Sequence, residues 1–248
     1  MRLRLLLNSV LLTVACVTAP LRADELVFGV STGSAMPMTE FSKGELAGGL
    51  LRDFGDALAR ELRYQARYVS LPRKRVEAAL ADGQVDLLCD LRPEWLDGRS
   101  WLWSDTVFIN EQIIVSRRDT APLAALPALA GERIGTILGY RYPRMEKVFG
   151  PRFVRDDAAS DDVNLSKLLN HRFSYLITNS LYFDYQLTTH PQRAGLAPAY
   201  LKVMTFDTYC VLPPHGKLDL PRLNQAIAAL RRRGDIDRMR DRYRPPPQ

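Results

Sequence analysis

The sequence has 248 residues, of which 46% are hydrophobic and 25% are charged, a composition that excludes collagen-like and intrinsically disordered proteins. Its three cysteines are too few for a small disulfide-rich scaffold. The formal net charge is +6, and removal of residues 1–23, which hold three arginines and no acidic residue, leaves +3. This modest excess does not indicate a nucleic-acid partner.

The N-terminal segment is predicted to be a secretory signal peptide. Its apolar run, residues 5–17, follows two arginines and is ended by Pro20 before it is long enough to span a membrane. The residues up to Ala23 suit signal-peptide cleavage, so we expect a mature periplasmic protein that begins at residue 24. Attachment of a lipid at Cys16 is the alternative processing event.

Apolar or β-branched runs alternate with amphipathic helices along the mature chain, an order typical of α/β proteins. In the first part, strands are expected at 26–30, 66–71, 85–89 and 111–117, and helices at 50–62 and 72–82. Pro72 and Gly83 are typical of the start and the end of the second helix. A polar, proline-containing stretch, 118–127, separates this part from the next.

The same alternation returns after this stretch and predicts a second, smaller α/β unit. Strands are expected at 132–138, 152–156 and 174–179, with helices around 145–149 and 165–169. Two further extended runs, 201–206 and 208–213, bring the chain back to closing helices at 223–230 and 236–243.

Several strings in this order resemble the bacterial extracellular solute-binding proteins of family 3, the group best known for periplasmic amino-acid receptors of ABC importers. They are FGV followed by PMTEF, GELAGGLLRDFGDALAREL, LPRKRVEAALADGQVDLL, WSDTVF with IIVSRRD, LAGERIGTILG and LNQAIAALRRRGDIDRMRDRYR. The resemblance implies a two-lobe periplasmic-binding-protein fold of type II, whose ligand cleft lies between the lobes and closes on the ligand. Residues 24–112 and 207–248 would form lobe one, and residues 113–206 would form lobe two.

The resemblance also implies a function and partners. A protein of this kind captures a small polar or anionic solute as a monomer and delivers it to the membrane subunits of an ABC importer. A periplasmic sensing module that reports to a membrane signalling partner is an alternative of a different class. Transport and sensing both stay open at this stage.

Two positions depart from the pattern of the amino-acid receptors in this family. Those receptors hold the ligand carboxylate with an arginine shortly after the third strand, but here Arg92 comes too early and Arg99 too late. They hold the amino group with an aspartate after the strand at 174–179, where this chain has the uncharged Asn179. A standard α-amino acid is therefore not the expected ligand.

Candidate ligand contacts are expected at strand ends, at helix starts and on nearby aromatic side chains. The set is Ser31, Thr32, Met38, Phe41, Arg75, Asp90, Arg92, Trp95, Tyr140, Arg141 and Asn179. In the basic run 73–75, at a helix start where positive charge opposes the helix dipole, Arg75 is expected to face an anion. Trp95 can stack on a planar or cationic ligand. Solvated surface and ordinary packing are the alternative interpretations.

Motifs for enzyme chemistry are absent from the sequence, so a binding protein is expected. His171, His190 and His215 lack metal-ligand spacing, and no nucleotide-binding or hydrolase motif occurs in context, so no metal or other cofactor is expected. Some family 3 relatives are cyclohexadienyl dehydratases, and Glu94 beside Arg92 is the pair that could serve such chemistry.

Cys89 and Cys210 are the two cysteines of the mature chain. They lie in the strand at 85–89 and in the run 208–213, by which the chain re-enters lobe one. In the sheet order that the resemblance implies, these strands are neighbours about 4.8 Å apart, so the two Cα atoms should lie within about 8 Å. An oxidising compartment permits a disulfide between them, and two buried thiols are the alternative.

Overall fold

The computed structural model describes residues 24–97, 100–120, 123, 125–190 and 195–244. The predicted signal peptide, with Cys16, and the displaced Arg99 lie outside the described residues. Within the described ranges, no helix is both long enough and apolar enough to cross a membrane.

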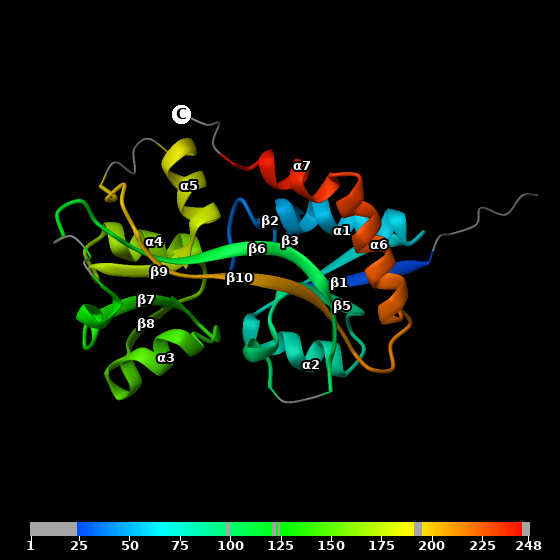
Figure 1. The fold of residues 1–248 in the computed structure, drawn as a ribbon, viewed down its shortest axis with the longest axis horizontal. Coiled ribbons are helices and arrows are strands. Elements are labelled where there is room, and N and C mark those ends of the chain that lie inside the picture. The colour runs from blue at the N-terminus through cyan, green and yellow to red at the C-terminus, as the bar shows by residue number, and fades with distance from the viewer. Residues whose placement is uncertain (1–23, 98–99, 121–122, 124, 191–194, 245–248) are drawn as a thin grey trace, which may run out of the picture.

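Two lobes lie side by side and are connected by two long strands that run across the middle of the molecule (Figure 1). Lobe one contains β1 (Glu25–Ser31), β2 (Glu40–Ser42), β3 (Glu45–Gly48), α1 (Leu50–Glu61), β4 (Gln65–Leu71), α2 (Val76–Ala81), β5 (Leu87–Leu91), α6 (Leu220–Arg232) and α7 (Asp235–Asp241). Lobe two contains β7 (Arg133–Ile137), α3 (Pro143–Phe149), β8 (Val154–Ala158), α4 (Asp161–Leu169), β9 (Tyr175–Asn179) and α5 (Ser180–Thr189). The connecting strands are β6 (Leu102–Ser116) and β10 (Leu201–Leu212).

One sheet extends through both lobes in the order β4-β1-β5-β10-β6-β9-β7-β8. In lobe one, β1 is parallel to β4 and β5, and in lobe two β7 is parallel to β8 and β9. The connecting strands are antiparallel to each other, and they join the two parallel sets through β5 and β9. The α/β fold predicted from the sequence is therefore confirmed.

The connecting strands are longer than the sequence predicted. β6 begins at Leu102 and includes part of the Trp-rich segment, and the runs 201–206 and 208–213 belong to one strand, β10. The polar residue Asp207 separates these runs in the sequence, but its backbone pairs with Ile109 of β6, because the ladder depends on main-chain groups. The expected lobe boundaries, 112/113 and 206/207, fall inside these two strands.

Helices cover both faces of the sheet in each lobe (Figure 1). In lobe one, α1, α6 and α7 pack on one side and α2 packs on the other, which gives two hydrophobic cores. In lobe two, α4 and α5 lie over one core and α3 lies over the other. Leu50, Phe54 and Leu58 of α1 are at most 1% exposed, so the apolar face predicted for this helix is confirmed.

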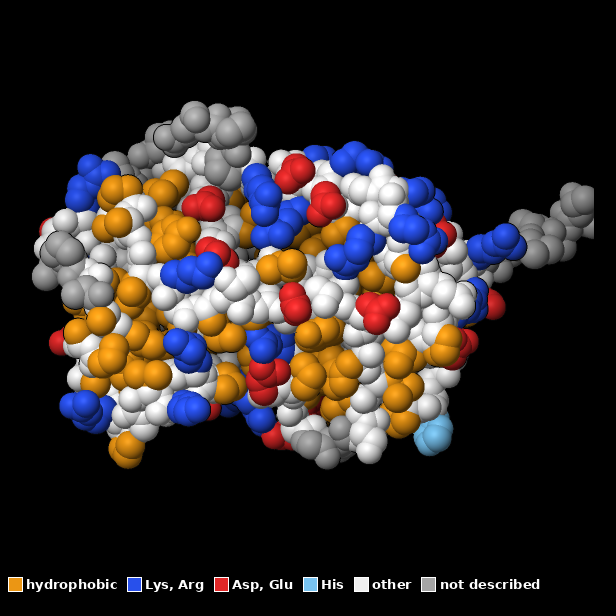
Figure 2. All heavy atoms as spheres, in the orientation of Figure 1, with side chains coloured by type: hydrophobic (Ala, Val, Ile, Leu, Met, Phe, Trp, Pro, Cys, Tyr) orange, Lys and Arg blue, Asp and Glu red, His pale blue; other side chains and the backbone are white. Residues whose placement is uncertain are grey.

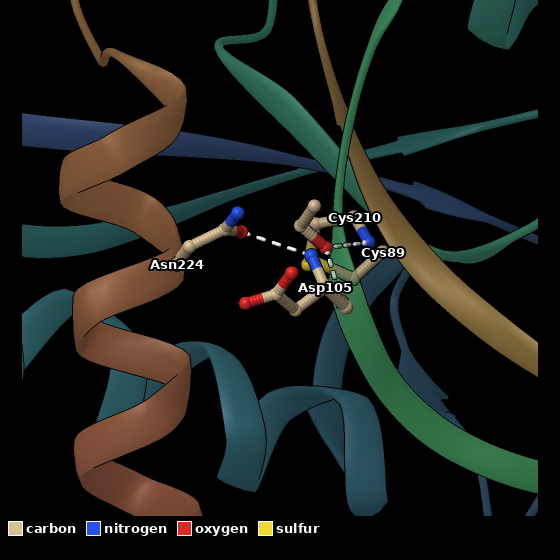
Figure 3. The surroundings of a disulfide bond; sticks show 5 residues. Cys89, Asp105, Cys210 and Asn224 are labelled. Carbon is tan, nitrogen blue, oxygen red and sulfur yellow. Dashed lines mark hydrogen bonds between the residues drawn. A yellow bond between two sulfur atoms is a disulfide. The ribbon is translucent and has the colours of Figure 1, made fainter.

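A disulfide joins Cys89 of β5 to Cys210 of β10, with the two Cα atoms 3.9 Å apart (Figure 3). The strand order and the short distance agree with the expectation for this pair. Next to it, Ser104 of β6 accepts a hydrogen bond from the backbone N–H of Cys210 at 2.9 Å. Asn224 of α6 accepts one from the backbone N–H of Asp105 at 2.9 Å. The disulfide therefore belongs to a region where α6 and three strands are held together.

Candidate functional site

A cavity of about 120 Å³ lies between the two lobes, at the carboxyl ends of β1, β5, β7 and β9. Open α/β sheets place their ligands at these strand ends. This volume is well above the space that a single bound water molecule needs. That capacity suits a small molecule such as a single amino acid.

Most of the contacts expected from the sequence line this cavity. They are Ser31, Met38, Asp90, Trp95, Tyr140, Arg141 and Asn179. Thr32 does not line it, and its backbone N–H donates to the carbonyl oxygen of Leu71 at 3.0 Å. Phe41 does not line it either, because it lies in the β2–β3 hairpin and pairs with Leu46. Arg92 lies in a second, neighbouring hollow.

Arg73, and not Arg75, is the arginine of the basic run that lines the cavity. Arg73 is 9% exposed, and its Nη2 donates to the carbonyl oxygen of Trp95 at 2.5 Å, whereas Arg75 is exposed to solvent. The run 73–75 forms a 3-10 turn, η1, in which successive side chains point about 120° apart, so they cannot all turn inward. The predicted α-helix begins only after this turn, at Val76.

The Arg73 guanidinium is a buried cation without an acidic partner at close range. Burial lowers its pKa, and the Tyr140 hydroxyl and the Glu77 carboxylate act in the opposite direction. No carboxylate of the described chain lies within ion-pair distance of it. A buried cation is costly unless it is paired, so this position suits an anionic group of a ligand.

Asp161, the first residue of α4, is an acidic cavity residue that the sequence analysis missed. It is 7% exposed, and burial raises the pKa of its carboxyl to about 7, with a further contribution from the negative charge of Asp162. Thr178 donates a hydrogen bond to its Oδ1 at 3.5 Å. No Lys or Arg pairs with it within the described residues. Acidic residues are common in the first turn of a helix, so the sequence carried no sign of this role.

Asp90, which follows Cys89, is the second acidic group of the cavity. Its φ of 61° is left-handed, a conformation that aspartate tolerates better than most residues. Asn110 of β6 donates to its Oδ1 at 3.0 Å, and Thr208 of β10 also hydrogen-bonds to it. Burial raises the pKa of this carboxyl to about 6, although both hydrogen bonds lower it. Asp90 is therefore held by both connecting strands.

Tyr140 lies among the charged groups of the cavity. Burial raises the pKa of its hydroxyl, the charges of Asp161 and Asp90 raise it further, and Arg73 lowers it. The hydroxyl also hydrogen-bonds to the side chain of Ser31 in lobe one. Tyr140 of lobe two therefore contributes to a polar surface that both lobes share.

Contacts between the lobes border the cavity. The backbone N–H of Asp161 donates to the carbonyl oxygen of Gly33 at 3.0 Å, and Arg141 forms an ion pair with Asp97. A Cβ atom at Gly33 would lie 2.9 Å from a ring carbon of Tyr140, so the backbone approaches lobe two as closely as glycine allows. The structure therefore shows the lobes in contact.

Asn179 has a structural role at the start of α5. Its Oδ1 accepts a hydrogen bond from the backbone N–H of Tyr182 at 2.8 Å and caps the helix. The sequence argument against an α-amino acid relied on the missing acid at this position and on the displaced arginine after the third strand. Asp161 supplies a carboxylate and Arg73 supplies a guanidinium to the same cavity, so both parts of that argument lose their basis.

Trp95 contacts Phe206 of β10 edge to face, with ring centroids 5.6 Å apart. Both residues line the cavity and also the neighbouring hollow. Phe206, together with Ser34, Gln112 and Thr178, belongs to the lining that the sequence analysis did not identify. These residues lie in a loop or inside strands, where nothing in the local pattern marks a ligand contact.

No protein-family model matches the sequence, and a comparison with curated proteins found no similar sequence. Solved structures of similar fold do cover most of the chain. An ancestral arginine-binding protein bound to arginine has a TM-score of 0.76 and 18% sequence identity, over 90% of this chain and 99% of that protein.

Two further solved structures carry the same fold. The arginine-, lysine-, histidine-binding protein ArtJ from the thermophilic bacterium Geobacillus stearothermophilus has a TM-score of 0.73 and 19% identity, over 90% of this chain and 97% of that protein. An ancestral amino-acid-binding protein, a precursor of cyclohexadienyl dehydratase, has a TM-score of 0.72 and 18% identity, over 89% and 95%. The chain therefore has the two-lobe type II fold of amino-acid substrate-binding proteins.

Proposed function

We propose that this chain is a periplasmic solute-binding protein that captures a small amphoteric solute, similar in size and charge to a polar amino acid, and delivers it to an ABC importer. The observation that carries the proposal is the presence of two unpaired, opposite charges in one cavity, Arg73 from lobe one and Asp161 from lobe two. The solute would supply the missing partner of each.

The two charges suit different ends of such a solute. The Arg73 guanidinium can donate to a carboxylate, and charge-assisted hydrogen bonds of this kind are the strong ones. A carboxyl with a pKa of about 7 is partly ionised at neutral pH, and an ammonium or guanidinium group beside it would favour its ionised form. Binding would then relieve the cost of burying both groups.

The fold supports capture by closure of the lobes. Residues 24–112 with 207–248 would move as one body and residues 113–206 as the other, with the bending in β6 and β10, the strands that connect the lobes. Because Arg73 and Asp161 lie on different lobes, a solute that contacts both would favour the closed arrangement.

The similar solved structures support an amino-acid-like solute, since two of them are arginine-binding proteins. Delivery to an importer and export by the predicted signal peptide are parts of the same proposal. A sensing module would use the same cavity, so it differs only in the membrane partner that recognises the closed form.

The proposal also holds that the protein is not an enzyme. The pair Arg92 and Glu94, considered for a dehydratase, forms an ion pair in the neighbouring hollow, outside the lining of the main cavity. Prephenate and arogenate should therefore stay unchanged on incubation with the protein. Formation of phenylpyruvate or phenylalanine at enzymatic rates would contradict this part of the proposal.

The test begins with native mass spectrometry of the protein purified from periplasm, which identifies any solute that stays bound. Calorimetry against the twenty amino acids and related amines and acids then measures affinity. We expect Arg73→Gln and Asp161→Asn each to weaken binding about 10- to 150-fold, because a hydrogen bond to a charged partner contributes about 1.5–3 kcal/mol.

Arg75→Gln is the matched control, since it makes the same charge change two residues away at a solvent-exposed position. Its affinity should equal that of the wild type. Unchanged affinity in both Arg73→Gln and Asp161→Asn would refute the proposed site, and failure of every solute to bind would refute the proposed function.

A further inference from the structure

A second hollow, which we call the outer hollow, adjoins the cavity and carries charge that the proposed function does not use. It has a volume of about 240 Å³ and shares Trp95, Gln112 and Phe206 with the cavity. Its charged lining residues are Arg92, Glu94, Arg144 and Lys147. Three cations against one acid leave an excess of positive charge beside the ligand cavity.

Arg92 belongs to lobe one and is mostly shielded from solvent. It forms an ion pair with Glu94, and its side chain is 18% exposed. Its guanidinium carbon lies 5.1 Å from the centre of the Phe206 ring. Its Nε is buried and has no hydrogen-bond partner within the described chain. Arg92 therefore keeps a donor that Glu94 does not satisfy.

Arg144 and Lys147 belong to lobe two and lie three residues apart on α3, so their side chains share one side of the helix. Both are exposed, and no carboxylate of the described residues forms an ion pair with either. Figure 2 shows Lys and Arg side chains over α3 and beside the boundary between the lobes, next to hydrophobic side chains. Within the described part of lobe two, no ion pair neutralises these two charges.

We propose that the solute carries a second anionic group, a carboxylate or a phosphate, and that the outer hollow holds it through Arg92, Arg144 and Lys147. This inference rests on the proposed function, because the amphoteric end of the same solute occupies the cavity with Arg73 and Asp161. The linking part of the solute passes Trp95 and Phe206, which line both spaces. Since Arg92 and α3 lie on different lobes, the second anionic group adds another contact that favours closure.

The test uses inorganic phosphate as the probe and the line width of its ³¹P resonance as the readout. Phosphate is titrated at constant ionic strength into the wild type and into Arg73→Gln, whose cavity has lost its own anion site. In each background the double variant Arg144→Gln/Lys147→Gln is compared with Arg118→Gln/Arg232→Gln. This control removes the same charge at two exposed positions that do not line the outer hollow.

We expect phosphate binding to persist in Arg73→Gln, to weaken at least tenfold in the α3 double variant, and to change less than twofold in the control. If the two double variants lost the same amount of phosphate affinity, phosphate binding would depend on net charge alone, and the inference would be overturned. The absence of any phosphate binding would overturn it as well. If Arg73→Gln fails to fold, the same comparison in the wild-type background decides the question.

A second measurement is the solute recovered from the purified protein, which should contain two acidic groups. A recovered solute with a single acidic group, whose binding depends on Arg73 and Asp161, would leave the proposed function standing and refute only the outer hollow. The opposite result is phosphate binding that depends on Arg144 and Lys147, together with no solute whose binding depends on Arg73. That result would support the outer hollow as an anion site and would refute the proposed function.

Discussion

Replacement of Asp161 by asparagine should stabilise the unliganded protein at high pH while it weakens solute binding. Burial raises the pKa of this carboxyl from 3.8 to about 7, so the folded state favours the protonated form. Each pKa unit corresponds to about 1.4 kcal/mol, so ionised Asp161 costs the fold about 4 kcal/mol at pH 8. Below pH 3.8 the carboxyl is protonated in both states and does not affect stability; the cost grows as the pH rises from 3.8 to about 7 and is fully present above that.

The amide of asparagine has the shape of the carboxyl and never ionises, so the variant escapes this cost. It loses a favourable charge in the first turn of α4, which is worth about 0.3–1 kcal/mol. We therefore expect Asp161→Asn to raise the free energy of unfolding by about 3 kcal/mol at pH 8 and by less than about 1 kcal/mol at pH 4. Urea unfolding of solute-free protein, followed by circular dichroism at both pH values, measures the difference.

Asp235→Asn is the matched control, because Asp235 is also the first residue of a helix, α7. Arg233 and Arg238 lower the pKa of its carboxyl, so its contribution to stability is present at neutral pH and is lost as the pH falls through the lowered pKa. The two substitutions should therefore change stability at pH 8 in opposite directions. A stability gain from Asp161→Asn that is the same at pH 4 and pH 8, or no gain at all, would refute the reasoning that burial of an unpaired carboxylate carries the cost.

Two further predictions concern the contact between the lobes and the disulfide. Gly33→Ala places a methyl group 2.9 Å from Tyr140, and overpacking of this kind costs about 1–3 kcal/mol, so solute affinity measured by calorimetry should fall about 5- to 150-fold. Gly195→Ala, whose new methyl group would lie 3.6 Å from Leu169, should leave affinity unchanged, and equal affinities of the two variants would contradict the role of Gly33. Cys89→Ser/Cys210→Ser opens a loop with a sequence separation of 121, so the chain-entropy model predicts a loss of about 5 kcal/mol in the free energy of unfolding. Stability in urea that does not respond to this double substitution or to a reducing agent would show that the disulfide does not form.

The local pattern of the sequence determined the order and type of most elements. Helix α1 follows from apolar residues at helical spacing, because one face must be buried against the sheet whatever the surroundings are. The neighbouring positions of Cys89 and Cys210 followed from the sheet order that the family resemblance implied, and the structure agrees with it. The length of β10 could not be predicted from the sequence, because Asp207 interrupts its apolar pattern. The strand continues through this position only because its backbone pairs with β6.

The sequence by itself therefore determined an α/β chain, and it marked several strand ends whose residues line the cavity, whereas the return strand beside β5 followed from the family resemblance. Only the tertiary structure decided which charges meet in the cavity. Arg73 and Arg75 have the same side chain and lie two residues apart, so the sequence does not distinguish them. The side chain of Arg73 faces the cavity because of the way η1 packs against Trp95. In the sequence, Asp161 looks like an ordinary acidic residue at the start of a helix. Its carboxyl is desolvated only because lobe one packs over it in the folded protein. Since those segments are distant in the chain, the local residue pattern around Asp161 does not indicate its burial.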